Sequence, residues 1–76
     1  MTEYTAEITK RGVRFTAFLN EAGKTCSEYV RAYNPDGSEI GVVHQATFAA
    51  SNLATAKRTE YCRVMLASIA DSYFRV

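Results

Sequence analysis

Apolar and polar side chains alternate most clearly at residues 13–20, which read VRFTAFLN. Val13, Phe15, Ala17 and Leu19 fall on one side of an extended chain, and the intervening side chains fall on the other. A period of two residues is typical of a half-buried β-strand. We therefore expect this segment to turn its Val/Phe/Ala/Leu set toward a core and to leave the intervening side chains in water.

The preceding segment, residues 3–9, alternates in the same way, with Tyr4, Ala6 and Ile8 on one side. Residues 10–12 read KRG and separate the two segments, and their glycine is free to adopt a positive φ. The pattern predicts a first hairpin. A second turn is expected at residues 20–23, which read NEAG.

The strongest turn signal is NPDG at residues 34–37. Proline presets φ at the first central position of a turn, aspartate suits the second, and glycine suits a left-handed bulge position. The signal predicts a hairpin between strands at residues 25–33 and 39–46. In the latter strand, alternation places Ile40, Val42 and His44 toward the core and Val43 away from it.

The inward face of the strand at residues 25–33 can be chosen in two ways. Either Cys26, Val30 and Ala32 face the core together with Glu28, or the tyrosines do so together with Arg31. We prefer the first choice, because we expect the carboxylate of Glu28 to reach water more easily.

Alternation ends after residue 48, and residues 53–72 contain neither glycine nor proline. Their apolar side chains recur with helical spacing, which predicts one amphipathic helix with Ser51 or Asn52 as its N-cap. Arg58 lies near the centre of the apolar stripe, and we expect its side chain to extend past the sheet edge into water. Leu53 and Val64 fall on the polar side, as scattered surface residues or as a partner contact.

These segments predict a single α+β domain over residues 1–76. Its sheet is an antiparallel four-stranded meander in the order 1-2-3-4, and one C-terminal amphipathic helix packs on one face. An alternative has three longer strands, with the first strand pairing only partly.

Composition narrows the function classes. The 76 residues carry nine Lys and Arg against eight Asp and Glu, whereas a nucleic-acid binder usually has a basic excess. No apolar run reaches the ~18 residues of a membrane-spanning helix, and residues 1–7 lack the features of a signal peptide. We expect a cytoplasmic protein in which Cys26 and Cys62 stay reduced, since two cysteines do not form a disulfide framework.

The sequence shows no catalytic or metal-binding pattern. A nucleophile–histidine arrangement would have to use His44, the single histidine, and we expect instead a partly buried imidazole hydrogen-bonded to the backbone. Close ligand pairs of the kind that bind zinc are missing, and the four glycines do not form a phosphate loop. We predict a protein that is not an enzyme and has no cofactor or metal site.

One face of the predicted sheet has the composition of a recognition surface, because aromatic and arginine side chains are enriched at protein interfaces. The alternative is an ordinary solvated face on which these residues favour the strand conformation. The predicted partner-binding residues are Arg14, Thr16, Phe18, Tyr29, Arg31 and Tyr33.

We therefore expect a small protein-binding module. Very small domains of this architecture often occlude a larger complex, as phage and mobile-element inhibitors of bacterial defence do, and this analogy rests on size and architecture. An alternative is a homodimeric structural or assembly protein, paired through edge strands or through Leu53 and Val64.

A further alternative is a DNA-binding domain that reads a groove with its sheet. Residues 11–14, which read RGVR, and the Thr-Phe pair at 47–48 resemble plant APETALA-type and integrase arm-binding domains. The resemblance covers about a dozen residues and implies DNA contacts by Lys10, Arg11, Arg14 and Arg31. The tryptophan usual in the plant domains is missing.

Overall fold

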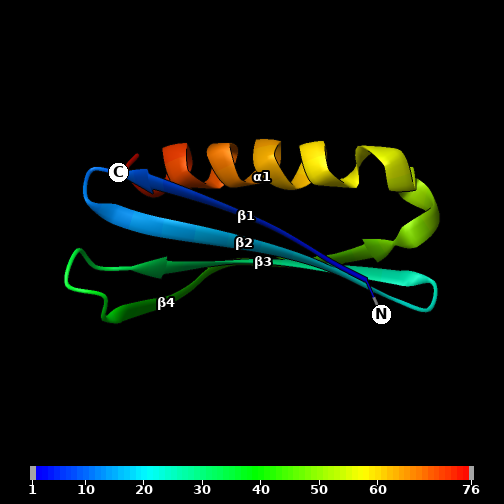
Figure 1. The fold of residues 1–76 in the computed structure, drawn as a ribbon, viewed down its shortest axis with the longest axis horizontal. Helices are drawn as coiled ribbons and strands as arrows, with labels where there is room; N and C mark the ends of the chain where they lie inside the picture. Colours follow the sequence, from blue (N-terminus) through cyan, green and yellow to red (C-terminus); the bar gives the residue numbers. More distant parts are fainter. Residues whose placement is uncertain (1, 76) are drawn as a thin grey trace.

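The computed structural model describes residues 2–75 and forms one sheet followed by one helix (Figure 1). The elements are β1 (Thr2–Lys10), β2 (Val13–Ala22), β3 (Thr25–Tyr33), β4 (Glu39–Ala49) and α1 (Arg58–Tyr73). The four strands are antiparallel and lie in the order β1-β2-β3-β4. The predicted α+β fold is confirmed, and the three-stranded alternative is wrong, because β1 pairs with β2 over its whole length.

The first two hairpins have two-residue turns. Arg11 and Gly12 adopt φ values of 53° and 80°, and positive φ at both positions gives a turn whose twist matches that of the strands. The second turn lies at residues 23–24, because β2 continues to Ala22. The predicted turn at residues 20–23 therefore began too early. The NPDG turn between β3 and β4 is confirmed, and the backbone N–H of Gly37 donates to the carbonyl of Asn34 at 2.9 Å.

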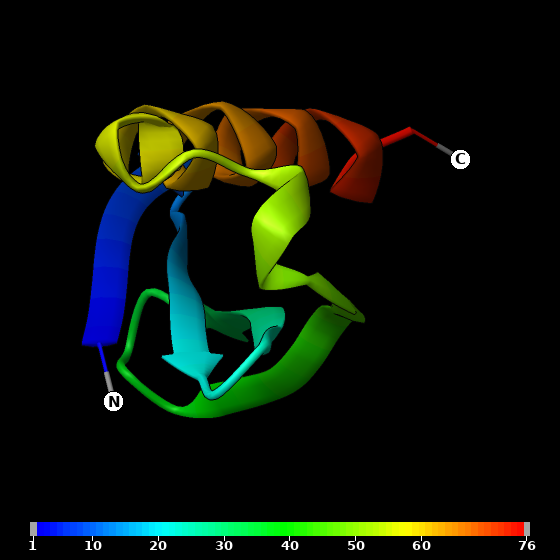
Figure 2. The same cartoon turned by 90° about the vertical axis from the view of Figure 1, so that its right-hand side faces the viewer.

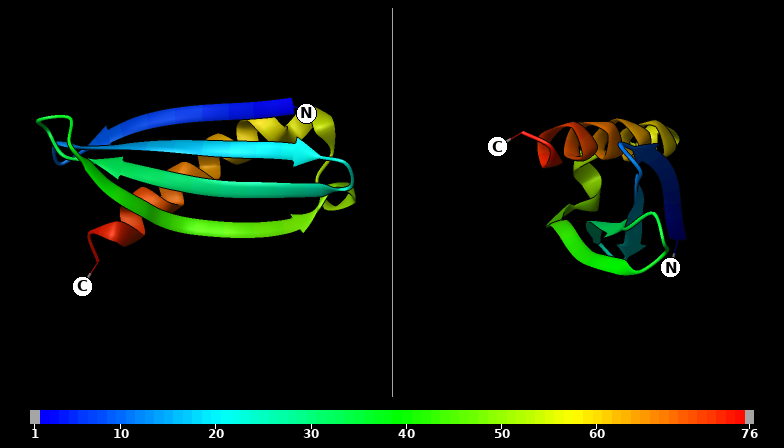
Figure 3. Two further views of the ribbon diagram at one scale, coloured as in Figure 1. Left: turned by 90° about the horizontal axis from the view of Figure 1, so that it is seen from below. Right: turned by 90° about the vertical axis from the view of Figure 1, so that its left-hand side faces the viewer.

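The helix covers one face of the sheet, here called the inner face. Figures 2 and 3 show α1 crossing the sheet obliquely, with β3 and β4 curling away from it, and its main contacts are with β1 and β2. Phe15, Ala17 and Leu19 of β2 and Cys62 of α1 are fully buried there, and Leu66 of α1 is nearly so. The predicted orientation of β2 is confirmed, and Phe18 faces the opposite side, the outer face.

The preferred inward face of β3 is also confirmed. Cys26, Val30 and Ala32 are fully buried, and Glu28 points the same way. The expectation that its carboxylate reaches water is wrong, because Glu28 is only 5% exposed. Its two carboxylate oxygens are instead bound by side chains of β4 and α1.

The predicted orientation of β4 is correct at His44 and wrong toward its beginning. Two register shifts interrupt the β3–β4 ladder, and they place Val42 opposite Arg31 on the outer face. Val42 is accordingly 49% exposed, Ile40 is exposed, and Val43 packs against the core. A β-bulge inserts an extra residue and so exchanges the faces of the residues beyond it.

The predicted helix began five residues too early. Residues 50–57 contain two short 3₁₀ turns, Ala50–Asn52 and Thr55–Lys57, and α1 begins at Arg58. Neither Ser51 nor Asn52 acts as an N-cap of α1. The chain bends at Leu53, which is extended and packs against the core.

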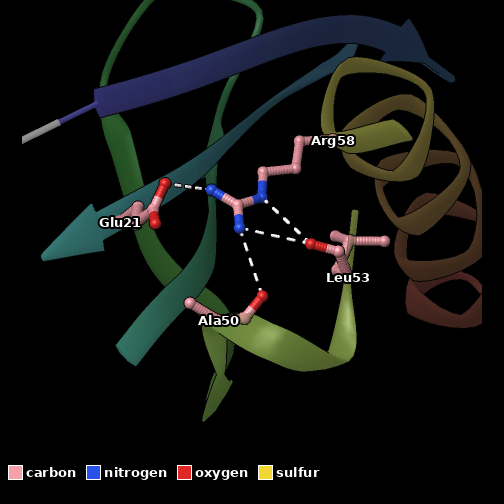
Figure 4. A network of polar contacts seen from close by, with 4 residues as sticks. All are labelled: Glu21, Ala50, Leu53 and Arg58. Carbon is pink, nitrogen blue, oxygen red and sulfur yellow. Dashed lines mark hydrogen bonds and ion pairs between the residues drawn. The ribbon is translucent and has the colours of Figure 1, made fainter. Parts of the chain in front are cut away.

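Arg58 is buried rather than extended into water, with 3% exposure (Figure 4). Its guanidinium forms an ion pair with Glu21 at the end of β2 and donates to the carbonyls of Ala50 and Leu53, each 3.2 Å from Nη2. Burial by itself lowers the pKa of Arg58, but the hydrogen bond and the charge of Glu21 outweigh it, so that the pKa is raised. Arg58 therefore joins the end of β2 to the chain that leads into α1.

Candidate recognition surface

The outer face brings together all six side chains predicted to bind a partner. They lie on the two central strands as three directly opposed pairs, because residues that face each other across an antiparallel ladder share one side of the sheet. The pairs are Arg14 with Tyr33, Thr16 with Arg31, and Phe18 with Tyr29. The side of the sheet seen in the left panel of Figure 3 has α1 behind it, so this surface is not covered by the helix.

The aromatic side chains of this surface are held by neighbouring groups. The rings of Phe18 and Tyr29 stack with centroids 4.8 Å apart and an interplanar angle of 17°. The guanidinium of Arg14 lies 4.6 Å from the ring centroid of Tyr33, and that of Arg31 lies 5.7 Å from the centroid of Tyr29. Both are cation–π distances. The surface is thus a ladder of stacked planar groups.

Each arginine of the surface has a carboxylate partner. Arg31 donates to Glu39 at 2.7 Å, and Arg14 lies 3.4 Å from Glu7. The hydrogen bond and the charge of Glu39 raise the pKa of Arg31. The charges of these two pairs cancel, and Glu3 lies on the same face opposite Asn20, so these charged side chains give the outer face no basic excess.

Beyond these six residues, the structure shows a polar cluster under the helix that the sequence did not indicate. The hydroxyl of Tyr61 donates to Glu28 Oε1, and His44 Nε2 lies 2.7 Å from Glu28 Oε2. The expected backbone partner of His44 is therefore replaced by a buried carboxylate. The inward positions of Glu28 and His44 on neighbouring strands were the available signal, but the bulges in β4 obscured which residues face each other.

The surroundings of this cluster favour the protonated, less reactive forms of Tyr61 and of its neighbour Cys62. Burial, followed by the hydrogen bond and charge of Glu28, raises the pKa of Tyr61 to about 12. Burial, followed by the charge of Glu28, also raises the pKa of the Cys62 thiol. A thiol with a raised pKa is a poor nucleophile at neutral pH. Cys26 and Cys62 are both free and buried.

Within residues 2–75, no three His, Cys, Asp or Glu side chains gather in a way that would hold a metal ion. None of the helical structure in the same residues is long and apolar enough to cross a membrane. No protein-family model, curated protein or solved structure matches the chain.

Proposed function

We propose that the protein is a non-enzymatic protein-binding module and that the outer sheet face is its binding surface. The observation that carries the proposal is the ladder on β2 and β3, in which Phe18 stacks on Tyr29 and both arginines lie over tyrosine rings. Tyrosine and arginine dominate binding hot spots. Side chains already held in place lose less conformational freedom on binding, so more of their contact energy appears as affinity.

The charges of this surface favour a protein over a nucleic acid. Arg14 and Arg31 are each paired with a glutamate, and a nucleic acid would have to displace those carboxylates before its phosphates could take their place. The net charge of the chain is +1. A protein partner, in contrast, gains from mixed polar and aromatic contacts without needing a basic surplus.

A narrower form of the proposal is an inhibitor that occludes a functional surface of a larger complex, such as a phage or mobile-element protein directed at a bacterial defence complex. It rests on analogy of size and architecture. Two free, buried thiols are consistent with action in the cytoplasm, where cysteines stay reduced.

The test compares matched variants as immobilised baits. Phe18→Ala removes the stacked ring from the outer face, and Val64→Ser changes an exposed residue on α1, which lies on the opposite side of the sheet. We expect a protein retained by the wild type and by Val64→Ser to be lost with Phe18→Ala, with an affinity about 30-fold weaker or worse. Thermal melts establish that both variants are folded.

The proposal fails if Phe18→Ala retains the same proteins as the wild type with unchanged affinity. Binding to duplex DNA at low salt that weakens steeply as salt is added would favour a DNA-binding domain instead.

A further inference from the structure

The two edges of the sheet differ in regularity. β1 pairs with β2 without interruption from Thr2, opposite Glu21, to Lys10, opposite Val13. At the other edge, β4 carries two register shifts. Bulges are a common protection against strand pairing, whereas a long regular edge is a template for it. Within residues 2–75, β1 is a terminal strand of the sheet and pairs with no strand other than β2 (Figure 3, left panel).

The unpaired backbone groups of β1 follow from its turn. Lys10 and Val13 flank the two-residue turn and form its closing pair, which exchanges hydrogen bonds in such hairpins. Because the direction of the backbone groups alternates along a strand, the even-numbered residues of β1 bond to β2. The N–H and C=O groups of Glu3, Thr5, Glu7 and Thr9 therefore point outward.

We propose that this edge pairs with the same edge of a second copy of the chain, antiparallel about a two-fold axis, with Ala6 opposite Ala6. This register uses the whole strand, since Thr2 of one copy then lies opposite Lys10 of the other. The four outward-pointing residues of each copy form about eight hydrogen bonds between the chains. The contact is isologous, as in most dimers.

The charges of β1 select this register. With Ala6 at the axis, Glu3 faces Thr9 of the second copy, and Glu7 faces Thr5. Moving the axis to Thr5 places Glu3 opposite Glu7, and moving it to Glu7 places that glutamate opposite itself. Like charges directly opposed destabilise a sheet, so both neighbouring registers are disfavoured.

The inner face supports the same register. Ile8, which is 37% exposed, lies opposite Tyr4 of the second copy, and pairing therefore covers an apolar side chain that the monomer leaves in water. The dimer has a continuous eight-stranded sheet. The β2 strands of the two copies lie three strand spacings apart, about 14 Å, so the outer faces form one surface.

The first test is sedimentation equilibrium combined with amide hydrogen exchange. We expect a monomer–dimer equilibrium in which exchange at the amides of Thr5 and Glu7 slows as concentration rises, while that of Ala6 does not change. Thr5→Pro removes an outward N–H, which an edge strand tolerates, and it should abolish the dimer. Thr5→Ala keeps the N–H and should retain the dimer.

A second pair of variants tests the register without removing a backbone group. Thr5→Lys places a lysine opposite Glu7 of the second copy twice in each dimer, and Thr5→Glu places a glutamate there. We expect dissociation constants that differ by about tenfold or more, with the lysine variant tighter. A strict monomer up to ~1 mM, a dimer that survives in folded Thr5→Pro, or equal effects of the lysine and glutamate variants would each overturn the proposal.

Discussion

Arg58 is a charged side chain within the folded interior, and its surroundings explain why it stays there. Its guanidinium reaches the carboxylate of Glu21 and the carbonyls of Ala50 and Leu53 (Figure 4). Those two carbonyls belong to the bent chain that precedes α1, where the residues form few backbone hydrogen bonds of their own. A planar group with five donors suits such a set of acceptors.

Replacing Arg58 by methionine keeps most of the volume and removes all donors. Glu21 and the carbonyl of Leu53 then lose their donor, and the carbonyl of Ala50 keeps only the 3.4 Å hydrogen bond from the backbone N–H of Leu53. We therefore expect the melting temperature to fall by more than about 10 °C. Arg58→Lys should recover only part of the loss, since an ammonium group does not reach all three acceptors. A melt of Arg58→Met within about 3 °C of the wild type would contradict this account.

Tyr61 provides a prediction about pH. Its pKa is raised to about 12 in the folded protein, by burial and then by the hydrogen bond to Glu28, whereas an ordinary tyrosine titrates near ~10. The folded state therefore holds the proton more tightly than the unfolded state. The resulting stabilisation is fully present below pH ~10 and is lost as pH rises toward ~12, by about 2 kcal/mol.

Denaturant unfolding at a series of alkaline pH values measures this loss. Tyr61→Phe lacks the titrating hydroxyl and should lose about 2 kcal/mol less than the wild type between pH ~10 and ~12. At neutral pH the same variant should be less stable by about 1–2 kcal/mol, because Glu28 loses a donor. Parallel pH profiles for the two proteins would refute the assignment.

At the scale of elements, the chain leading into α1 lacks an N-cap side chain. Ala54 has the extended backbone of an N-cap, with φ −60° and ψ 138°, and makes no side-chain cap hydrogen bond. The 3₁₀ turn that follows it runs directly into α1. An acceptor at position 54 would therefore meet free N–H groups at the start of the helical segment.

We expect Ala54→Asp to stabilise the protein by about 1 kcal/mol and to raise its melting temperature by about 4–8 °C. Ser51→Ala is the matched control and should leave the melt unchanged, because Ser51 lies inside the first 3₁₀ turn and caps nothing. A stable Ala54→Asp with no gain, combined with a destabilised Ser51→Ala, would indicate that the helical segment begins earlier.

Alternation along the sequence predicted the strands and the inward side of residues 13–20. It left two choices for residues 25–33, and the correct one was preferred on the expectation that Glu28 reaches water, which is wrong. The period of two at residues 13–20 and 25–33 places every predicted recognition residue on one side, and the structure shows them paired. These segments are regular, so a local pattern predicts which of their residues share a face. The contacts among their side chains depend on the register between strands, which the hairpin turns determine.

The misassigned segments depend on tertiary contacts. The bulges of β4 have no alternating signature, and they reverse Val42 and Val43. The start of the helix was predicted wrongly because residues 50–57 contain no proline or glycine to mark the bend. Arg58 stays inside only because β2 is long enough to bring Glu21 next to it.

At the scale of the whole molecule, the two faces of β2 have different surroundings. Leu19 is fully buried against the helix side, and its neighbour Phe18 lies on the outer face. A core of this size supplies only about 3–5 kcal/mol in total. A single large truncation in the core therefore consumes most of the stability.

We expect Leu19→Ala to cost about 2–5 kcal/mol and therefore to leave little residual stability. Phe18→Ala should cost only about 1 kcal/mol, mainly the lost stacking on Tyr29. Urea titrations followed by circular dichroism compare the two. Similar losses in the free energy of unfolding for both variants would mean that the two faces of β2 contribute equally to stability.

The register shifts of β4 have a consequence for the proposed assembly through strand edges. Growth into a fibre requires every molecule to have two edge strands that can pair, so that each added molecule leaves one edge free for the next. Here only one border is straight. In the proposed dimer both remaining sheet edges are irregular β4 strands, which disfavour further pairing, so we expect assembly through strand edges to stop at two copies.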